Sequence, residues 1–177
     1  MRIAGLAALL IITATVSGCI ADRTNTISHT GGVRQTLRGP GGLQVRLVRY
    51  LPRVPARHDV SGLATPTPGM HFVAFLIHMC IATSYLPTIA PQNFALALAN
   101  GVDATLKFPQ SVFAKDLDLL GAAGCERGHI VFEVPHNERP TALRFGLDWS
   151  TTDMEGFTNS TKLRFEWKLS HANLKRG

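Results

Sequence analysis

The feature that most constrains the fold is the strict alternation of apolar and polar residues near the end of the chain. Residues 142–149 and 162–169 both place large apolar side chains at every second position. Side chains of a strand point alternately to opposite faces, so each segment has one apolar face to bury. Both segments are therefore predicted to be half-buried strands. The apolar positions are Leu143, Phe145, Leu147 and Trp149, followed by Leu163, Phe165, Trp167 and Leu169.

Further strand patterns precede these two. Residues 43–50 nearly alternate, and residues 71–82 form an apolar run that fits a central strand buried on both faces. The remaining segments are 94–99, 102–108 and 129–135, with Asn100-Gly101 predicting a hairpin turn between the first two. About seven strands with turn signals between them, and no long helical pattern, predict an all-β chain folded as an antiparallel β-sandwich.

The start of the chain resembles an export signal. Arg2 precedes an apolar run, Ile3 to Val16, that is too short to span a membrane comfortably. The following order, Val16-Ser17-Gly18-Cys19, resembles the lipobox of bacterial lipoproteins, in which the cysteine is lipidated and becomes the first mature residue. Residues 1–18 are thus predicted to be a lipoprotein signal peptide and Cys19 the lipidated residue. The alternative is an ordinary secretory signal followed by a chance cysteine.

The composition changes again after Cys19. Residues 19–42 are rich in Gly, Ser, Thr and Asn, which predicts a flexible tether with an r.m.s. span of about 25 Å. Residues 43–177 follow as one folded domain of about 135 residues, long enough to bury about two-thirds of its unfolded surface. The chain is expected to be exported and anchored by lipid on the extracytoplasmic face of the cell membrane.

The chain contains three cysteines. If Cys19 carries lipid, Cys80 and Cys125 remain as an even pair in an oxidising compartment, which favours a disulfide between them. The bridge would close a loop of about 45 residues and stabilise the fold by about 4 kcal/mol. The alternative is two reduced, buried cysteines that pack as small apolar residues.

Three segments together resemble a known family. They are Gly69-Met70-His71-Phe72-Val73-Ala74-Phe75-Leu76-Ile77, then Asn93-Phe94-Ala95-Leu96 with Asn100-Gly101, then Gly124-Cys125-Glu126-Arg127-Gly128-His129-Ile130-Val131-Phe132-Glu133-Val134-Pro135. In this order they are similar to the telokin-like, immunoglobulin-fold domain of unknown function found in bacterial, including actinobacterial, lipoproteins. Secreted mycobacterial immunogenic proteins share that fold class. The resemblance implies an immunoglobulin-like sandwich and no established enzymatic activity.

The residues themselves indicate no enzyme and no cofactor. A nucleophile elbow, a zinc-protease helix motif and a phosphate-binding glycine loop are all missing from the sequence. Asp116 and Asp118 could ligate a cation but also fit a solvated loop. The sharper alternative is a copper site, because imidazole and thioether ligands suit copper. Its candidate ligands are His71, His78, Met79 and His129, although strand alternation sends several of them to opposite faces.

Positive charge is concentrated in one stretch of this basic chain, whose formal net charge is +6. The arginines are Arg34, Arg38, Arg46, Arg49, Arg53 and Arg57, opposed by Asp59 alone. Anionic lipid headgroups attract each such residue by about 1 kcal/mol near a surface, and anionic cell-wall polymers would act alike. Nucleic acid is an unexpected partner for an exported chain without a basic-aromatic motif. The sequence thus predicts a binding module at the cell envelope, for a protein, glycan or lipid, with copper binding as the alternative.

Overall fold

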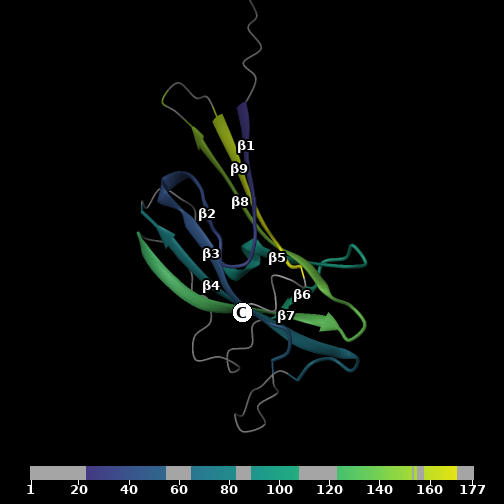
Figure 1. Cartoon of the computed structure of the whole chain (residues 1–177). Helices are drawn as coiled ribbons and strands as arrows, with labels where there is room; N and C mark the ends of the chain where they lie inside the picture. The colour runs from purple at the N-terminus through teal and green to yellow at the C-terminus, as the bar shows by residue number, and fades with distance from the viewer. Residues whose placement is uncertain are drawn as a thin grey trace, which may run out of the picture.

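The computed structural model describes residues 23–54, 65–82, 89–107, 123–152, 154 and 158–170, most of them in strands (Figure 1). The predicted signal peptide, the lipidation site Cys19, and the acidic pair Asp116 and Asp118 lie outside the described residues. So do most of the predicted loops at 52–68 and 107–123. In the part of the chain that is described, no helix has the length and apolar character needed to cross a membrane.

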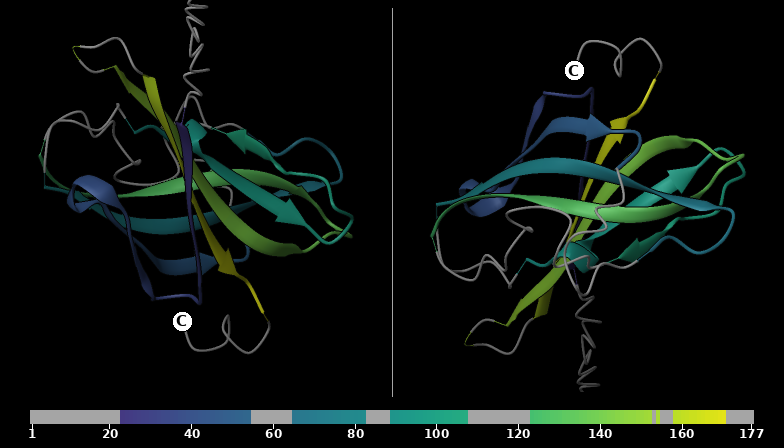
Figure 2. Two further views of the ribbon diagram at one scale, coloured as in Figure 1. Left: turned by 90° about the horizontal axis from the view of Figure 1, so that it is seen from above. Right: turned by 90° about the horizontal axis from the view of Figure 1, so that it is seen from below.

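The described residues form two sheets. The elements in chain order are β1 (Arg23–Gly31), β2 (Thr36–Arg38), η1 (Pro40–Gly42), β3 (Gln44–Leu51), β4 (Met70–Ile81), η2 (Pro91–Asn93), β5 (Phe94–Leu98), β6 (Thr105–Lys107), β7 (Gly124–Pro135), β8 (Pro140–Thr152) and β9 (Thr158–Lys168). One sheet has the strand order β1-β9-β8-β5 and the other β2-β3-β4-β7-β6. Figure 2 shows them as two layers whose strands cross at an angle. The predicted all-β sandwich is thereby confirmed.

The space between the sheets is filled by the alternating apolar residues. Phe75 and Met79 of β4 are fully buried from one side, and Trp167 of β9 is fully buried from the other. The rings of Phe165 and Trp167 meet edge to face at 6.1 Å, and the Trp167 indole N–H donates to the carbonyl oxygen of Gln35 at 3.2 Å. Burying side chains of this size contributes about 1.5–3 kcal/mol each. This apolar layer therefore holds the two sheets together.

All of the predicted strands are present, as β3 to β9. The predicted position of 71–82 as a central strand is also confirmed, because β4 has β3 on one side and β7 on the other. Its outward-facing Phe72 and Ala74 are buried in a second, smaller cluster with Val54 and Val131. The long apolar run thus reflects burial on both faces of β4.

The predicted flexible tether over 19–42 is wrong for most of its length. Residues Arg23–Gly31 form β1, which pairs in parallel with β9, and Thr36–Arg38 form β2, which pairs with β3. Figure 1 shows β1, β9 and β8 lying side by side. As an edge strand, β1 keeps most of its side chains exposed, so it needs no apolar alternation. Its stability comes from the backbone ladder, which a pattern of polar residues does not reveal.

The hairpin predicted between 94–99 and 102–108 forms next to its turn but does not continue along the whole of the second segment. Gly101 does adopt the left-handed backbone of a turn, with φ 83°. The chain then crosses between layers: β5 pairs with β8 in one sheet, whereas β6 pairs with β7 in the other. Next to the turn, the Leu98 N–H donates to the carbonyl oxygen of Val102 at 3.0 Å and the Ala104 N–H to that of Leu96 at 2.8 Å, around the antiparallel bridge from Ala97 to Asp103. The turn therefore closes a short hairpin, and the chain then passes from one sheet to the other.

Candidate functional site

The outward face of the five-stranded sheet carries a row of basic residues. Arg46 of β3 pairs in register with His78 of β4, and His78 pairs with Arg127 of β7. The positions flanking Arg46 and His78 along their strands point into the core, so these side chains point outward. Three basic residues from three adjacent strands thus lie across one face.

A bulge in β3 adds a fourth basic residue, Arg49, to this face. The register of β3 with β4 shifts between Leu47 and Arg49, with Val48 as the extra residue. Without the shift, Arg49 would follow Leu47 onto the core face, because positions two apart share a face. With it, Arg49 pairs with Leu76 and is exposed on the same face as Arg46. The bulge therefore gathers two arginines that strict alternation would separate.

Arg34 approaches the same face from the turn between β1 and β2. Its backbone is left-handed, with φ 72°, and its N–H donates to the carbonyl oxygen of Leu47 at 2.8 Å. Together these residues surround a shallow depression of about 430 Å³. Its lining consists of Arg34, Arg46, Val48, Arg49, Leu76 and Arg127. We call this the arginine depression: its lining combines four arginines with two aliphatic residues.

These guanidinium groups differ from those of Arg144 and Arg164, which are paired with carboxylates. Arg144 lies 3.2 Å from a carboxylate oxygen of Glu166, and Arg164 pairs with both carboxylate oxygens of Asp148. Among the described residues, by contrast, no ion pair involves an arginine of the depression. Side chains two strands apart are about 10 Å apart at the backbone, where like charges repel by about 0.4 kcal/mol in water. A bound anion would relieve that repulsion.

Two larger hollows combine basic and acidic residues. One, of about 740 Å³, is bordered by Tyr50, Pro140 and Lys168, and burial raises the pKa of Tyr50 to about 12. The other, of about 700 Å³, lies over the four-stranded sheet. Both include Arg144, which is already paired with Glu166. The 740 Å³ hollow also contains Arg139 and Lys168, for which the described residues provide no ion pair, but both hollows include Glu166, whereas the arginine depression has no acidic residue in its lining.

The same outward face also contains a buried carboxylate that the sequence did not single out. Glu133 is only 5% exposed, accepts a hydrogen bond from the Thr67 N–H at 2.6 Å, and lies 3.1 Å from the Lys107 ammonium. Desolvation alone would raise its pKa. The hydrogen bonds from Thr67 and Lys107 outweigh that effect and hold the pKa below its usual value. Glu133 of β7 thus links residue 67 and Lys107 of β6 through one carboxylate.

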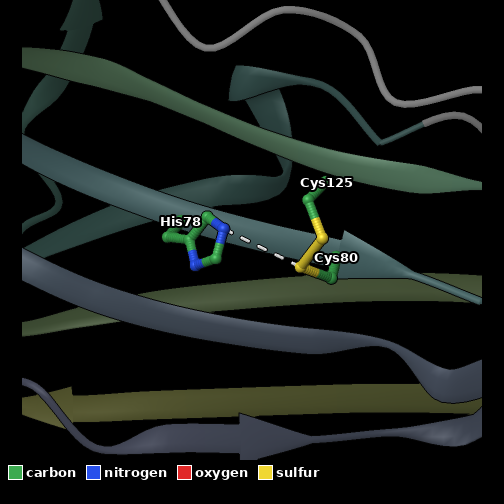
Figure 3. Close-up of a disulfide and its surroundings, with 3 residues drawn as sticks. All are labelled: His78, Cys80 and Cys125. Atoms are coloured by element: carbon green, nitrogen blue, oxygen red, sulfur yellow. Dashed lines mark hydrogen bonds between the residues drawn. A yellow bond between two sulfur atoms is a disulfide. The ribbon is translucent and has the colours of Figure 1, made fainter.

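The predicted disulfide between Cys80 and Cys125 is present, joining directly opposed residues of β4 and β7 (Figure 3). Cys125 is exposed at the start of β7, and Cys80 is half-buried near the end of β4. The two reduced, buried cysteines of the alternative are therefore not observed. Cys80 and Cys125 lie next to His78, so the two sulfur atoms are beside the row of basic residues on this face.

The candidate copper ligands do not converge. Met79 is fully buried in the core, whereas His78 points outward beside Cys80, with Nε2 3.8 Å from that sulfur. His71 lies at the other end of β4 and stacks on His136 at 5.3 Å. Burial, then the neighbouring His136, lowers the pKa of His71. His129 pairs with Leu76, between these two ends. The four candidate copper ligands are thus not brought together, because strand alternation separates Met79 from His78 and the length of β4 separates His71 from both.

The protein is thus a two-layer β-sandwich, with the arginine depression on the outward face of its five-stranded sheet. No protein-family profile matches the sequence, and no curated protein matches it. The fold is similar to that of MPT63, a secreted protein from Mycobacterium tuberculosis, with a TM-score of 0.50 at 12% identity over 81% of this chain and 98% of that one.

Another solved structure, a protein from Bacillus subtilis described as a possible lipoprotein and called ycdA, gives a TM-score of 0.47 at 13% identity. The alignment covers 75% of this chain and 38% of that one. A β-sandwich protein from Clostridium difficile gives 0.41 at 6% identity, over 79% and 95% of the two chains. At such identities the likeness concerns the fold alone.

Proposed function

We propose that this chain is an exported, lipid-anchored binding module, not an enzyme, whose arginine depression holds anionic phosphate groups at the membrane surface. One observation carries the proposal: four guanidinium groups surround a depression, and no ion pair among the described residues neutralises them. Residues 1–18 and the lipobox-like order ending at Cys19 support export and anchoring. The three resembling segments support kinship with the telokin-like domains of bacterial lipoproteins.

The chemistry of the lining favours phosphate. A planar guanidinium donates two parallel hydrogen bonds to phosphate oxygens, and several together can share one phosphodiester. The aliphatic side chains of Val48 and Leu76 in the lining suit the carbon atoms next to such a group. Anionic phospholipid headgroups combine both properties.

The position of β1 favours a lipid surface as the source of the phosphate. The strand begins at Arg23, four residues after Cys19. Four residues span at most about 14 Å when fully extended. An anchor at Cys19 would therefore keep the folded domain much closer to the bilayer than the predicted 25 Å tether. Each basic residue of the domain that reaches an anionic surface contributes about 1 kcal/mol of attraction.

Vesicle co-sedimentation tests the proposal with the chain 20–177, which keeps every described residue and lacks the predicted signal and lipid. We expect binding to phosphatidylcholine vesicles to rise with the fraction of phosphatidylglycerol and to weaken with salt. The variant R46E/R49E removes two positive charges from the depression and adds two negative ones. Its affinity should fall by about 30-fold or more, the equivalent of at least 2 kcal/mol.

A matched control separates the depression from net charge. The variant R139E/K168E changes the net charge equally, at exposed positions beside the 740 Å³ hollow. It should bind within about threefold of the wild-type chain, allowing for the weak long-range field. Binding that ignores the phosphatidylglycerol fraction, or an equal loss in the two variants, would refute the proposal.

A further inference from the structure

Three metal-ligand side chains meet at the surface where β4 ends and β7 begins. The ligand atoms of His78, Cys80 and Cys125 all lie within 4.8 Å of one another. Figure 3 shows the His78 ring turned toward the disulfide, with Nε2 3.8 Å from the sulfur of Cys80. Cys125 is exposed, so the sulfur pair can be reached from solvent.

The strand pairing fixes the backbone positions of His78, Cys80 and Cys125 relative to one another. Cys80 and Cys125 are directly opposed in the antiparallel ladder, and His78 precedes Cys80 by two positions on the same strand face. The ladder continues from Met70 to Ile81 along β4, so the positions of all three backbones are fixed by many neighbouring pairs. Only side-chain rotation is needed to change how the three ligand atoms are arranged.

We propose that reduction of this disulfide by a dithiol creates a binding site for a soft d10 cation, Zn²⁺ or Cu⁺, held by two thiolates and one imidazole. One thiolate of the dithiol attacks the exposed sulfur of Cys125, and the electron pair of the broken S–S bond leaves on Cys80. The second thiol then displaces Cys125 and closes the disulfide of the dithiol. Two electrons and two protons pass to the protein, and metal binding releases those two protons to water.

The ligand set suits such cations. Thiolate and imidazole are preferred ligands of Zn²⁺ and Cu⁺, and three protein ligands leave a position open to solvent or to a further ligand. Metal–sulfur bonds of about 2.3 Å and metal–nitrogen bonds of about 2.0 Å at tetrahedral angles place ligand atoms about 3.5–3.8 Å apart. The observed separations are close enough for side-chain rotation to reach that spacing.

The neighbouring charge assists the thiolates. Arg127 and Arg46 flank His78 in register on the two adjacent strands. Positive groups near a cysteine favour the thiolate over the thiol. His78 Nε2 also lies where its N–H can donate to the sulfur of Cys80 as that sulfur leaves. This inference does not rest on the proposed membrane binding, because it needs no anionic ligand, although Arg46 and Arg127 also line the depression.

A titration of the reduced chain 20–177 tests the site. The chain is reduced with a phosphine under anaerobic conditions and titrated with Zn²⁺ against a chelating dye, and with Co²⁺ as a spectroscopic probe. We expect one equivalent to bind, with a thiolate-to-cobalt charge-transfer band, and the oxidised chain to bind at least about 100-fold more weakly.

Single histidine variants supply the decisive control. H78A removes the proposed imidazole and should weaken Zn²⁺ binding by at least about 10-fold. H29A removes an exposed histidine of β1, in the other sheet, and should leave the affinity unchanged. Equal affinity for H78A and H29A would overturn the site. So would loss of the β-sheet circular dichroism on reduction without its recovery on adding Zn²⁺, because the ligands would then not be held by the fold.

Discussion

Removal of the disulfide should destabilise the fold by an amount that its loop length sets. The bridge joins residues separated by 45 positions. In the chain-entropy description, closing such a loop removes about 13 cal/mol/K from the unfolded chain, or about 4 kcal/mol at 25 °C. Because Cys125 is exposed and Cys80 only half-buried, replacing both by Ala removes less than about 1 kcal/mol of apolar burial. The variant C80A/C125A should therefore lose about 4 kcal/mol, nearly all of it through its less restricted unfolded state.

Denaturant and thermal unfolding of the chain 20–177 measure this loss, followed by the fluorescence of buried Trp167. The midpoint should fall while the m-value stays equal or rises slightly, because the unlinked unfolded chain exposes more surface. The melting temperature should fall by about 8–16 °C. Reduced wild-type chain should unfold at the same midpoint as the variant. A loss below about 1 kcal/mol, or a midpoint of reduced wild type equal to that of the oxidised chain, would refute the reasoning.

Two further predictions concern the backbone and the buried acid. Gly42 has φ +70°, and an added Cβ would lie 2.4 Å from the Cβ of Ala82, so G42A should cost at least about 2 kcal/mol. Gly101 has φ +83° but no neighbour within 4 Å, so G101A should cost only about 1 kcal/mol; equal costs by urea unfolding would contradict the steric argument. E133Q should cost about 1.5–3 kcal/mol at pH 7 by removing the charged partner of Lys107 and Thr67. Since the folded pKa of Glu133 is lowered, its contribution is present above its unfolded pKa and disappears as pH falls through the folded pKa. The stabilities of wild type and E133Q should therefore converge at pH values below that folded pKa, and a gap independent of pH would count against the assignment.

Much of the fold follows from the sequence because burial imposes a visible period. The alternation in residues 142–149 and 162–169 predicts β8 and β9, and the apolar run at 71–82 predicts a central strand. These segments face the core, so each must present apolar side chains at fixed positions. The disulfide follows from counting, because assigning Cys19 to lipid leaves one pair.

The remaining features depend on backbone hydrogen bonds and register, which leave little trace in residue type. β1 and β2 are edge strands with mostly polar residues, so they read as a tether. Asn100-Gly101 predicts a turn, but the turn does not determine which sheet receives the next strand. The arginine depression depends on the bulge at Val48, which turns Arg49 to the face of Arg46. The charge was visible in the sequence, whereas its concentration on one face was not.

Amide chemical-shift mapping tests the central claim most directly. The chain 20–177 would be titrated with a short-chain phosphatidylglycerol, and with the matching phosphatidylcholine as the control. Our account predicts shifts concentrated at Arg34, Arg46, Arg49 and Arg127, the residues that surround the arginine depression. The zwitterionic lipid should cause much smaller changes at these positions. Shifts concentrated on β8 and β9, or equal responses to the two lipids, would contradict the account.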